Sequence, residues 1–206
     1  MTVFDPLPRG RHKLSTEEVL ASQRARLLQA MLECVGEHGY AATTVPQVVA
    51  TARVSRNGFY ALFTDKAECF LALCDELGEE LLAEMYAFAD EPDWRESVAQ
   101  GTHAYLRWWQ RRPAFARAYL VELPSAGPRA LIQRDAQLRS YEAMFAALAA
   151  RARAGYPGLP PLNPLATRLL VHGVTELVAT EVREGRAEQL EALHDDLVAL
   201  VCGVLG

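Results

Sequence analysis

The sequence predicts an all-α protein, with an N-terminal three-helix helix-turn-helix head and a C-terminal helical bundle as its body, about nine helices in total. Apolar residues recur with the period of a helix along most of the chain, and no segment alternates as a strand does. Capping residues begin these segments, and proline or glycine ends them. The chain has 206 residues, 50% of them hydrophobic, which is enough for a sizeable core. We expect a flexible basic arm at 1–14, the head at 15–66 and the body at 67–206.

The first helix of the head is predicted to begin at Ser15, which forms a capping box with Glu18. The helix continues to Glu37, and Gly39 ends it. Its apolar face consists of Leu20, Leu27, Leu28, Met31 and Val35. This face supplies a platform on which two shorter helices can pack.

The first of the short helices follows a second capping box. Thr44 and Gln47 form that box, and Pro46 stands in the first turn, where its missing N–H costs little. The helix therefore begins at Val45, and its apolar face ends at Arg53.

The second short helix is capped by Ser55, and we interpret it as a recognition helix that enters DNA. At helical spacing, one side holds Phe59, Leu62 and Phe63, and the other holds Arg56, Asn57, Tyr60 and Ala61. A solvated surface without a partner is the alternative for Arg56 and Asn57. A half-buried packing residue is the alternative for Tyr60.

The body begins with a helix that Asp65 and Glu68 cap and whose first turn contains Lys66. A cation beside free backbone N–H groups is a natural phosphate contact. The helices of the body are expected at 66–88, 93–112, 115–123, 129–154, 165–185 and 187–205. Pro92, Pro113, Pro124 and the proline-rich loop at 155–164 separate them.

Charge is distributed unevenly along the chain. Residues 1–66 carry eight basic and six acidic side chains, a net charge of +2, whereas 67–206 carry 13 and 20, a net charge of −7. A basic head on an acidic body suits a protein that contacts phosphate at one end only. Within the head, we expect the arm at 1–14 to follow the DNA backbone or to enter a minor groove, and an exposed tail without a role is the alternative.

Several other classes of protein lack support in the sequence. There is no GxSxG, P-loop or dinucleotide-binding turn, so we expect no catalytic residue and no cofactor. Glu191 and His194 have the spacing of a di-iron motif, but it occurs once, so we expect no metal site. The four cysteines Cys34, Cys69, Cys74 and Cys202 are expected to be buried free thiols. Without a membrane span or signal peptide, the protein is expected to be soluble and cytoplasmic, with no membrane partner.

A specific set of residues in the head consists of Gly39-Tyr40, Thr43-Thr44-Val45, Val54-Ser55, Phe59-Tyr60, Phe63 and Lys66. With this set, the head resembles the DNA-binding domain of the TetR family of bacterial transcriptional regulators. The resemblance covers residues 15 to 75, and the all-helical body has a similar length. It implies a homodimer whose recognition helices enter successive major grooves of a partly palindromic operator, about 34–36 Å apart.

The DNA-binding set that we predict is Thr44, Arg53, Ser55, Arg56, Asn57, Gly58, Tyr60 and Lys66. By the resemblance, Thr44 and Lys66 hold phosphates and Tyr60 reaches the backbone. Arg56, Asn57 and Gly58 face base edges, where arginine reads guanine and asparagine reads adenine.

Two residues of this set depart from the family pattern. Arg53 stands where the family has glycine in the turn, so either the turn is altered or Arg53 gains a phosphate contact in return for a left-handed backbone. Gly58 stands where the family often has a small hydroxyl residue, which removes a possible phosphate contact and loosens the helix.

By the resemblance, the body holds a pocket for a small molecule between its middle helices. The candidate lining is Met85, Phe88, Trp94, His103, Tyr105, Leu106, Trp109, Phe115, Tyr119, Tyr141, Phe145 and His172. These side chains favour a hydrophobic or flat aromatic ligand over a phosphate or sugar. Ordinary core packing is the alternative for each of them. His103 is the most interesting candidate, because it is a titratable group among Trp and Tyr.

The last two helices are predicted to form the dimer interface as a four-helix bundle across a two-fold axis. The two stripes are Leu169, Gly173, Glu176, Leu177 and Thr180, joined by His172, and Leu193, Leu197, Leu200, Val201 and Val204. Burial inside one subunit is the alternative, because it satisfies the same stripes.

These features predict a ligand-responsive transcriptional regulator, a repressor released from a palindromic operator by a small hydrophobic or aromatic ligand, and not an enzyme. Its partners would be double-stranded operator DNA, an unidentified small molecule and a second copy of itself. The alternative is a helical small-molecule-binding or scaffold protein that does not read DNA, and Arg53 in the turn is the residue that favours it most.

Overall fold

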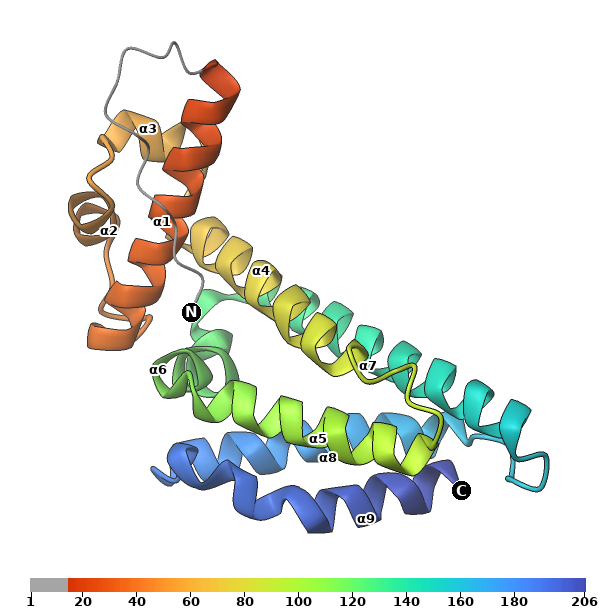
Figure 1. The fold of residues 1–206 in the computed structure, drawn as a ribbon. Helices are drawn as coiled ribbons and strands as arrows, with labels where there is room; N and C mark the ends of the chain where they lie inside the picture. The colour runs from red at the N-terminus through yellow and green to blue at the C-terminus, as the bar shows by residue number, and fades with distance from the viewer. Residues whose placement is uncertain (1–14) are drawn as a thin grey trace. The chain divides into compact units, whose positions relative to one another are not determined.

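The computed structural model describes residues 15–206, so the predicted arm at 1–14 lies outside the described residues. The regular elements of the described chain are all helices, nine of them α-helices, which confirms the predicted all-α class (Figure 1). The chain divides into two compact units between Leu73 and Cys74, further along than the expected boundary at 66/67. The two units are described separately below.

The N-terminal unit is built on α1 (Thr16–His38), against which α2 packs (Figure 1). The remaining elements are α2 (Val45–Ala52), α3 (Arg56–Tyr60) and the first part of α4 (Lys66–Tyr86). The buried face of α1 consists of Leu27, Leu28, Ala30, Met31, Cys34 and Val35. Leu20, which was predicted to belong to this face, is exposed.

The predicted caps of α1 are present. Ser15 N donates to the Glu18 carboxylate at 2.7 Å, and Glu18 N donates to Ser15 Oγ at 3.1 Å, which is a complete capping box. At the other end, Gly39 has φ 77°, and its N–H donates to Val35 O. The side chains in the sequence therefore determine both ends of this helix.

The C-terminal unit is a bundle in which α5 packs against α9, while α8 packs against both α7 and α9 (Figure 1). Its α-helices after α4 are α5 (Trp94–Gln110), α6 (Pro113–Ala116), α7 (Pro128–Gly155), α8 (Pro164–Arg183) and α9 (His194–Leu205). Shorter turns complete it: π-helical η1 (Arg117–Glu122) and the 3₁₀ turns η2 (Leu123–Ala126) and η3 (Ala187–Leu193).

Two predicted helices of the body are not regular α-helices. The segment expected as one helix at 115–123 is α6 followed by η1, and η2 begins at Leu123. Pro124 has no N–H to continue the ladder. The segment expected at 187–205 is η3 followed by α9, and within η3 the N–H of Glu191 donates to the side chain of Gln110 at 3.1 Å.

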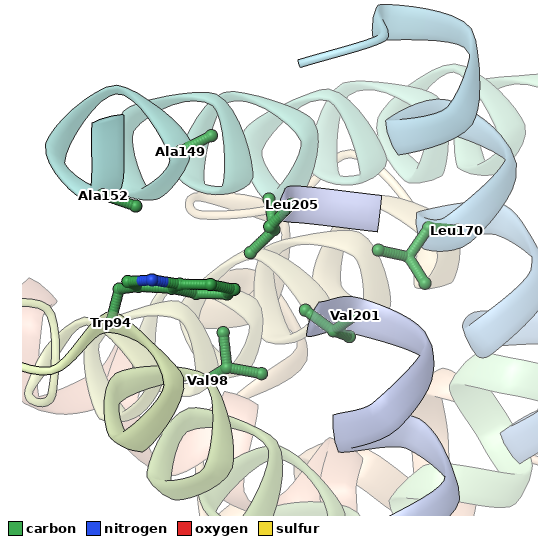
Figure 2. Close-up of a cluster of buried hydrophobic side chains, with 7 residues drawn as sticks. All are labelled: Trp94, Val98, Ala149, Ala152, Leu170, Val201 and Leu205. Atoms are coloured by element: carbon green, nitrogen blue, oxygen red, sulfur yellow. The ribbon is translucent and has the colours of Figure 1, made fainter. Parts of the chain in front are cut away.

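Seven buried side chains from four helices of the C-terminal unit form one core cluster (Figure 2). They are Trp94 and Val98 of α5, Ala149 and Ala152 of α7, Leu170 of α8, and Val201 and Leu205 of α9. Figure 2 shows Trp94 and Val201 both inside this cluster. Trp94 was a predicted ligand contact, with core packing as its alternative, and Val201 was a predicted dimer contact, with burial inside one subunit as its alternative. Both side chains are buried in the core of one subunit, as the alternatives state.

The cysteines follow the prediction at three of four positions. Cys34, Cys69 and Cys74 are buried free thiols, whereas Cys202 is partly exposed. Burial raises the pKa of the Cys69 thiol to about 12, so this thiol is unreactive at neutral pH. Among residues 15–206, no helix is long and apolar enough to cross a membrane.

Candidate DNA-binding surface and ligand cavity

The start of α2 uses the polar groups of Thr44. Gln47 N donates to Thr44 Oγ1 at 3.4 Å, and Thr44 N donates to Gln47 Oε1 at 2.8 Å. The Thr44 hydroxyl donates to the same oxygen at 2.7 Å. Because its hydroxyl proton is used in the cap, Thr44 would have to rotate away from Gln47 to donate to a phosphate.

The turn between α2 and α3 is retained with arginine in the glycine position. Arg53 has φ 52° and ψ 43°, the left-handed region, and is the only non-glycine residue with positive φ among residues 15–206. Val54 N donates to Val49 O at 3.1 Å, and Arg53 N donates to Ala50 O at 3.2 Å. This is a Schellman motif, which satisfies the last carbonyls of α2. The turn is therefore not altered. Arg53 in this turn no longer favours the alternative of a protein that does not read DNA.

The polar residues of α3 are exposed together. Ser55 Oγ accepts from Gly58 N at 3.0 Å and caps the helix, while Phe59 is fully buried beneath it. Arg56 and Asn57 are exposed, and Tyr60 is 48% exposed. The Tyr60 ring contacts Phe59 edge-on, with the ring centroids 5.3 Å apart, so one side of Tyr60 packs and the other faces solvent.

The structure revises the role predicted for Gly58. A Cβ at this position would lie 2.8 Å from Val54 Cγ1 and 3.3 Å from Gln23 Oε1. The side-chain direction of Gly58 is therefore toward Val54 and Gln23 of α1, not toward base edges. Gly58 permits a close approach inside the N-terminal unit.

The structure also gives the Lys66 side chain a different role from the predicted phosphate contact. Its Nζ donates to Tyr40 O at 2.8 Å, Thr43 O at 2.9 Å and Ala41 O at 3.4 Å, and lies 4.2 Å from the centroid of the Tyr40 ring. An ammonium has three protons, so all of them are used. Partial burial lowers the pKa of Lys66. The lysine thus fixes the loop between α1 and α2.

The cap of α4 also differs in detail from the predicted box. Asp65 Oδ1 accepts from Glu68 N at 2.7 Å, as expected. The Glu68 carboxylate, however, accepts from the N–H and hydroxyl of Thr64, at 2.6 and 2.5 Å. Thr64 is therefore part of this cap.

The C-terminal unit contains two neighbouring cavities, of about 40 and about 190 Å³. We name the first the tyrosine cavity, because Tyr105 and Tyr141 line it, and the second the arginine cavity, because Arg151 lines it. The tyrosine cavity is lined by Met85, Thr102, Tyr105, Tyr141, Phe145, Leu170, Val171, Val174, Thr175, Leu197 and Val201. The arginine cavity is lined by Met85, Tyr86, Ala89, Asp90, Ser97, Val98, Gly101, Thr102, Met144, Phe145, Ala147, Leu148 and Arg151.

Four of the predicted ligand residues line these cavities: Met85, Tyr105, Tyr141 and Phe145. The predicted residues Phe88, Trp94, His103, Leu106, Trp109, Phe115, Tyr119 and His172 line neither. Three residues of the second group, Trp109, Phe115 and Tyr119, pack among themselves: Trp109 stacks on Phe115 with centroids 6.0 Å apart and an interplanar angle of 6°. Core packing, the alternative given above, describes this aromatic group.

The two histidines among the ligand candidates lie at the surface. His103 is not surrounded by Trp and Tyr as predicted: its side chain is half-exposed, and its Nε2 lies 4.0 Å from Glu191 Oε1. The ring of His194 is its aromatic neighbour, with centroids 5.8 Å apart. His172 is also partly exposed, with its Nε2 3.6 Å from Glu142 Oε1.

The surroundings of Glu191 and His194 do not form a metal site. Arg107 Nε lies 3.2 Å from the Glu191 carboxylate, and His194 uses its two ring nitrogens for Ala99 O and Asp195. Among residues 15–206, no three His, Cys, Asp or Glu side chains gather in an arrangement suited to a metal ion. These contacts explain the two residues as a surface network.

The predicted dimer stripes separate into two sets. Leu197 and Val201 are buried inside the subunit and line the tyrosine cavity, so their assignment to the interface needs correction. Leu169, Gly173, Glu176, Leu177 and Leu200 are exposed, and Thr180, Leu193 and Val204 are partly exposed. The inward positions of α9 recur four residues apart, and the outward ones lie between them.

Comparison with known proteins identifies the N-terminal unit. The sequence profile of the family described as "Bacterial regulatory proteins, tetR family" matches residues 27–73. This unit belongs to the TetR family. The match confirms the resemblance inferred from the sequence and includes α2, the turn at Arg53, α3 and the start of α4.

A curated relative of this chain is the HTH-type transcriptional repressor AcnR of Corynebacterium diphtheriae. It is 31% identical over 87 residues, a region that covers 36% of this chain and 46% of the relative. The match thus spans about half of the relative's length.

Solved structures resemble the described chain in fold. The fatty acid degradation regulator FadR from Bacillus halodurans has a TM-score of 0.78 at 18% identity, covering 93% of this chain and 97% of that one. FadR from Bacillus subtilis, in complex with stearoyl-CoA, has a TM-score of 0.75 at 17% identity and covers 86% and 96%. The helical body therefore has the same fold as the bodies of these regulators.

Sequence reasoning missed several residues of the tyrosine cavity. Thr102 and Thr175 line it, but both are polar residues on helices with apolar stripes. Thr175 is buried because its hydroxyl donates to Val171 O at 2.8 Å, one turn earlier. A buried threonine of this kind gives no signal in a search for aromatic residues.

Proposed function

We propose that the protein is a ligand-responsive transcriptional regulator that binds operator DNA as a homodimer and acts as a repressor. The observation that carries the proposal is the TetR-family match over residues 27–73 together with the exposure of Arg56, Asn57 and Tyr60 on α3. Arginine and asparagine are the side chains that read guanine and adenine edges in a major groove. The name of the relative AcnR, a transcriptional repressor, supports the sign of regulation.

The ligand is proposed to be a small hydrophobic molecule held in the C-terminal unit. The two cavities support this choice, since their walls are mostly aliphatic and aromatic. The structure of FadR from Bacillus subtilis in complex with stearoyl-CoA is a precedent for an acyl-bearing ligand on this fold. Ligand would lower the affinity for DNA by its differential affinity for the two conformations.

Dimerisation is proposed to use the exposed side chains of α8 and α9. Leu169 is 66% exposed and Leu200 is 51% exposed, and the two helices pack against each other. Exposed leucines on adjacent helices are a typical partner surface. A two-fold axis through this face would build a four-helix bundle from two subunits.

A gel-shift experiment with the DNA upstream of the protein's own operon tests the DNA-binding part. Arg56→Ala and Tyr60→Phe are expected to weaken or abolish the shift while the dimer remains intact. Arg139→Ala, an exposed arginine of α7 in the other unit, is the matched control and should leave the shift unchanged. Binding that survives both changes in α3 would show that the recognition helix is wrongly assigned.

The salt dependence of binding is a second test. If side chains and backbone N–H groups neutralise phosphates, log K falls linearly with log salt concentration, by about 0.9 per phosphate contact. A binding constant that does not change with salt would contradict an operator complex of this kind.

A further inference from the structure

The two cavities of the C-terminal unit share part of their lining. Met85, Thr102 and Phe145 line both. These three residues therefore border both cavities. A ligand that moves the Met85 and Phe145 side chains aside can occupy both cavities, with a combined space larger than either offers alone.

The tyrosine cavity contains no charged side chain. Its polar groups are hydroxyls, and that of Thr175 is already used for Val171 O. Burial raises the pKa of Tyr105 to about 12, and that of Tyr141 rises as well, so both phenols remain neutral. An ionised group here would lose its hydration without gaining a counter-charge, which is strongly unfavourable. This cavity therefore accepts only the uncharged part of a ligand.

The lining of the arginine cavity contains one cation, Arg151, and one carboxylate, Asp90. The Nη1 of Arg151 lies 3.6 Å from Oδ1 of Asp90, whose side chain is fully exposed, and the Nη2 of Arg151 donates to Glu91 O at 3.4 Å. Both contacts are long, and an ion pair with a fully exposed carboxylate is weak. A guanidinium has five N–H donors in a planar fork, so Arg151 can bind a carboxylate or phosphate through two of them. Asp90 can turn into solvent as the anion enters.

Part of the arginine cavity's lining is apolar, with Val98, Met144 and Leu148 among its residues. From the charge of the two linings and the side chains that they share, we propose that the ligand is an anionic amphiphile. Its headgroup pairs with Arg151, and its uncharged chain passes Met85 and Phe145 into the tyrosine cavity. The inference rests on the proposed function, since it names the class of ligand for the same site.

Calorimetric titration of the purified full-length protein tests the headgroup. The probes are dodecanoate, dodecyl phosphate, dodecanol and dodecylammonium, each below its micelle concentration. We expect the two anions to bind about tenfold more tightly than the alcohol, because a charge-assisted bidentate pair replaces a neutral contact. The comparison of dodecanoate with dodecyl phosphate distinguishes a carboxylate from a phosphate headgroup.

Two variants locate the headgroup. Arg151→Gln should remove the preference for anions, whereas Arg153→Gln, whose guanidinium contacts Pro160 O on the loop and lines neither cavity, should retain it. Equal binding of all four probes, tighter binding of dodecylammonium, or an unchanged preference in Arg151→Gln would each overturn the assignment.

Chain length tests the use of both cavities. Phe145→Trp enlarges a side chain of the shared wall and should weaken tetradecanoate more than hexanoate, with Thr102→Leu as a second variant of that wall. An equal loss for both lengths in either folded variant would contradict entry into the tyrosine cavity. A gel shift of the ligand-free wild-type protein is independent of these titrations, so failure of DNA binding and failure of the ligand class are distinguishable.

Discussion

Two basic residues beside the recognition helix have roles that their charge alone does not reveal. Arg53 occupies a left-handed turn, and Lys66 points its ammonium at three carbonyls of the loop between α1 and α2. Arg53 holds a strained backbone conformation in the turn before α3, and Lys66 stabilises the loop before α2. Single substitutions at these two positions can therefore separate conformational effects from electrostatic ones.

Arg53→Gly is expected to stabilise the protein by about 0.5–1 kcal/mol. Glycine relieves a left-handed cost of about 1–2 kcal/mol but has more conformational freedom to lose on folding. The measurement is the free energy of unfolding in urea. Arg53→Ala is the matched control, since it removes the guanidinium and keeps the strain. If Arg53→Gly is destabilising while Arg53→Ala is equally so, the side chain contributes more than the backbone costs.

Lys66→Gln is expected to destabilise the protein by about 2 kcal/mol, because hydrogen bonds from a charged donor to buried carbonyls are lost. Hydrogen exchange should accelerate at the amides of residues 40–44. Arg56→Gln, at an exposed cation on α3, serves as the control and should change neither quantity. Unchanged stability in Lys66→Gln would contradict the structural role of this lysine and favour the predicted phosphate contact.

At the scale of elements, α4 and α7 of the C-terminal unit approach closely through glutamines of α7. Gln133 Nε2 donates to Asp75 Oδ1 at 2.5 Å, and the Gln137 amide lies against Gly78. A Cβ at Gly78 would be 1.8 Å from Gln137 Nε2. Glycine at this position therefore leaves the space that the Gln137 amide occupies.

Gly78→Ala should destabilise the protein by about 1 kcal/mol, since the flexible end of the Gln137 side chain must leave its place. Gly101→Ala is the control on α5: its Cβ would be 3.8 Å from Met85 O, an ordinary contact, so alanine should stabilise the helix by about 0.5–1 kcal/mol. Thermal unfolding followed by circular dichroism compares the two. An increase in Tm for both variants would mean that Gln137 relocates without cost.

For the whole molecule, assembly is the property on which the proposed operator complex depends. Leu200 on α9 and Ile132 on α7 are both exposed aliphatic residues, at 51% and 68%. Only the first lies on the proposed α8–α9 face. The pair therefore offers a test in which hydrophobicity is matched and position differs.

Leu200→Glu is expected to convert the dimer to a monomer, because a carboxylate buried in an apolar interface loses its hydration. DNA affinity should fall at the same time, since each half-site needs its own recognition helix. Light scattering during size-exclusion chromatography measures the assembly. Ile132→Glu should remain dimeric, and dissociation of that variant instead would place the interface on α7.

The sequence by itself determined the helices and their caps in the N-terminal unit. Ser15 with Glu18 and Thr44 with Gln47 act within four residues, and the family set lies within one continuous stretch from Gly39 to Lys66. Local hydrogen bonds and helical period are legible without a tertiary fold. The all-α class and the family of this unit followed from the same signals.

Only the tertiary structure decided which side chains are buried and which long-range contacts they make. It turned Leu197 and Val201 inward, joined Trp109 to the aromatic core, and directed Lys66 to carbonyls more than 20 residues away. An apolar stripe is the same in sequence whether it faces a cavity, a core or a second subunit. The neighbours across the bundle, which the helical period does not encode, make that choice.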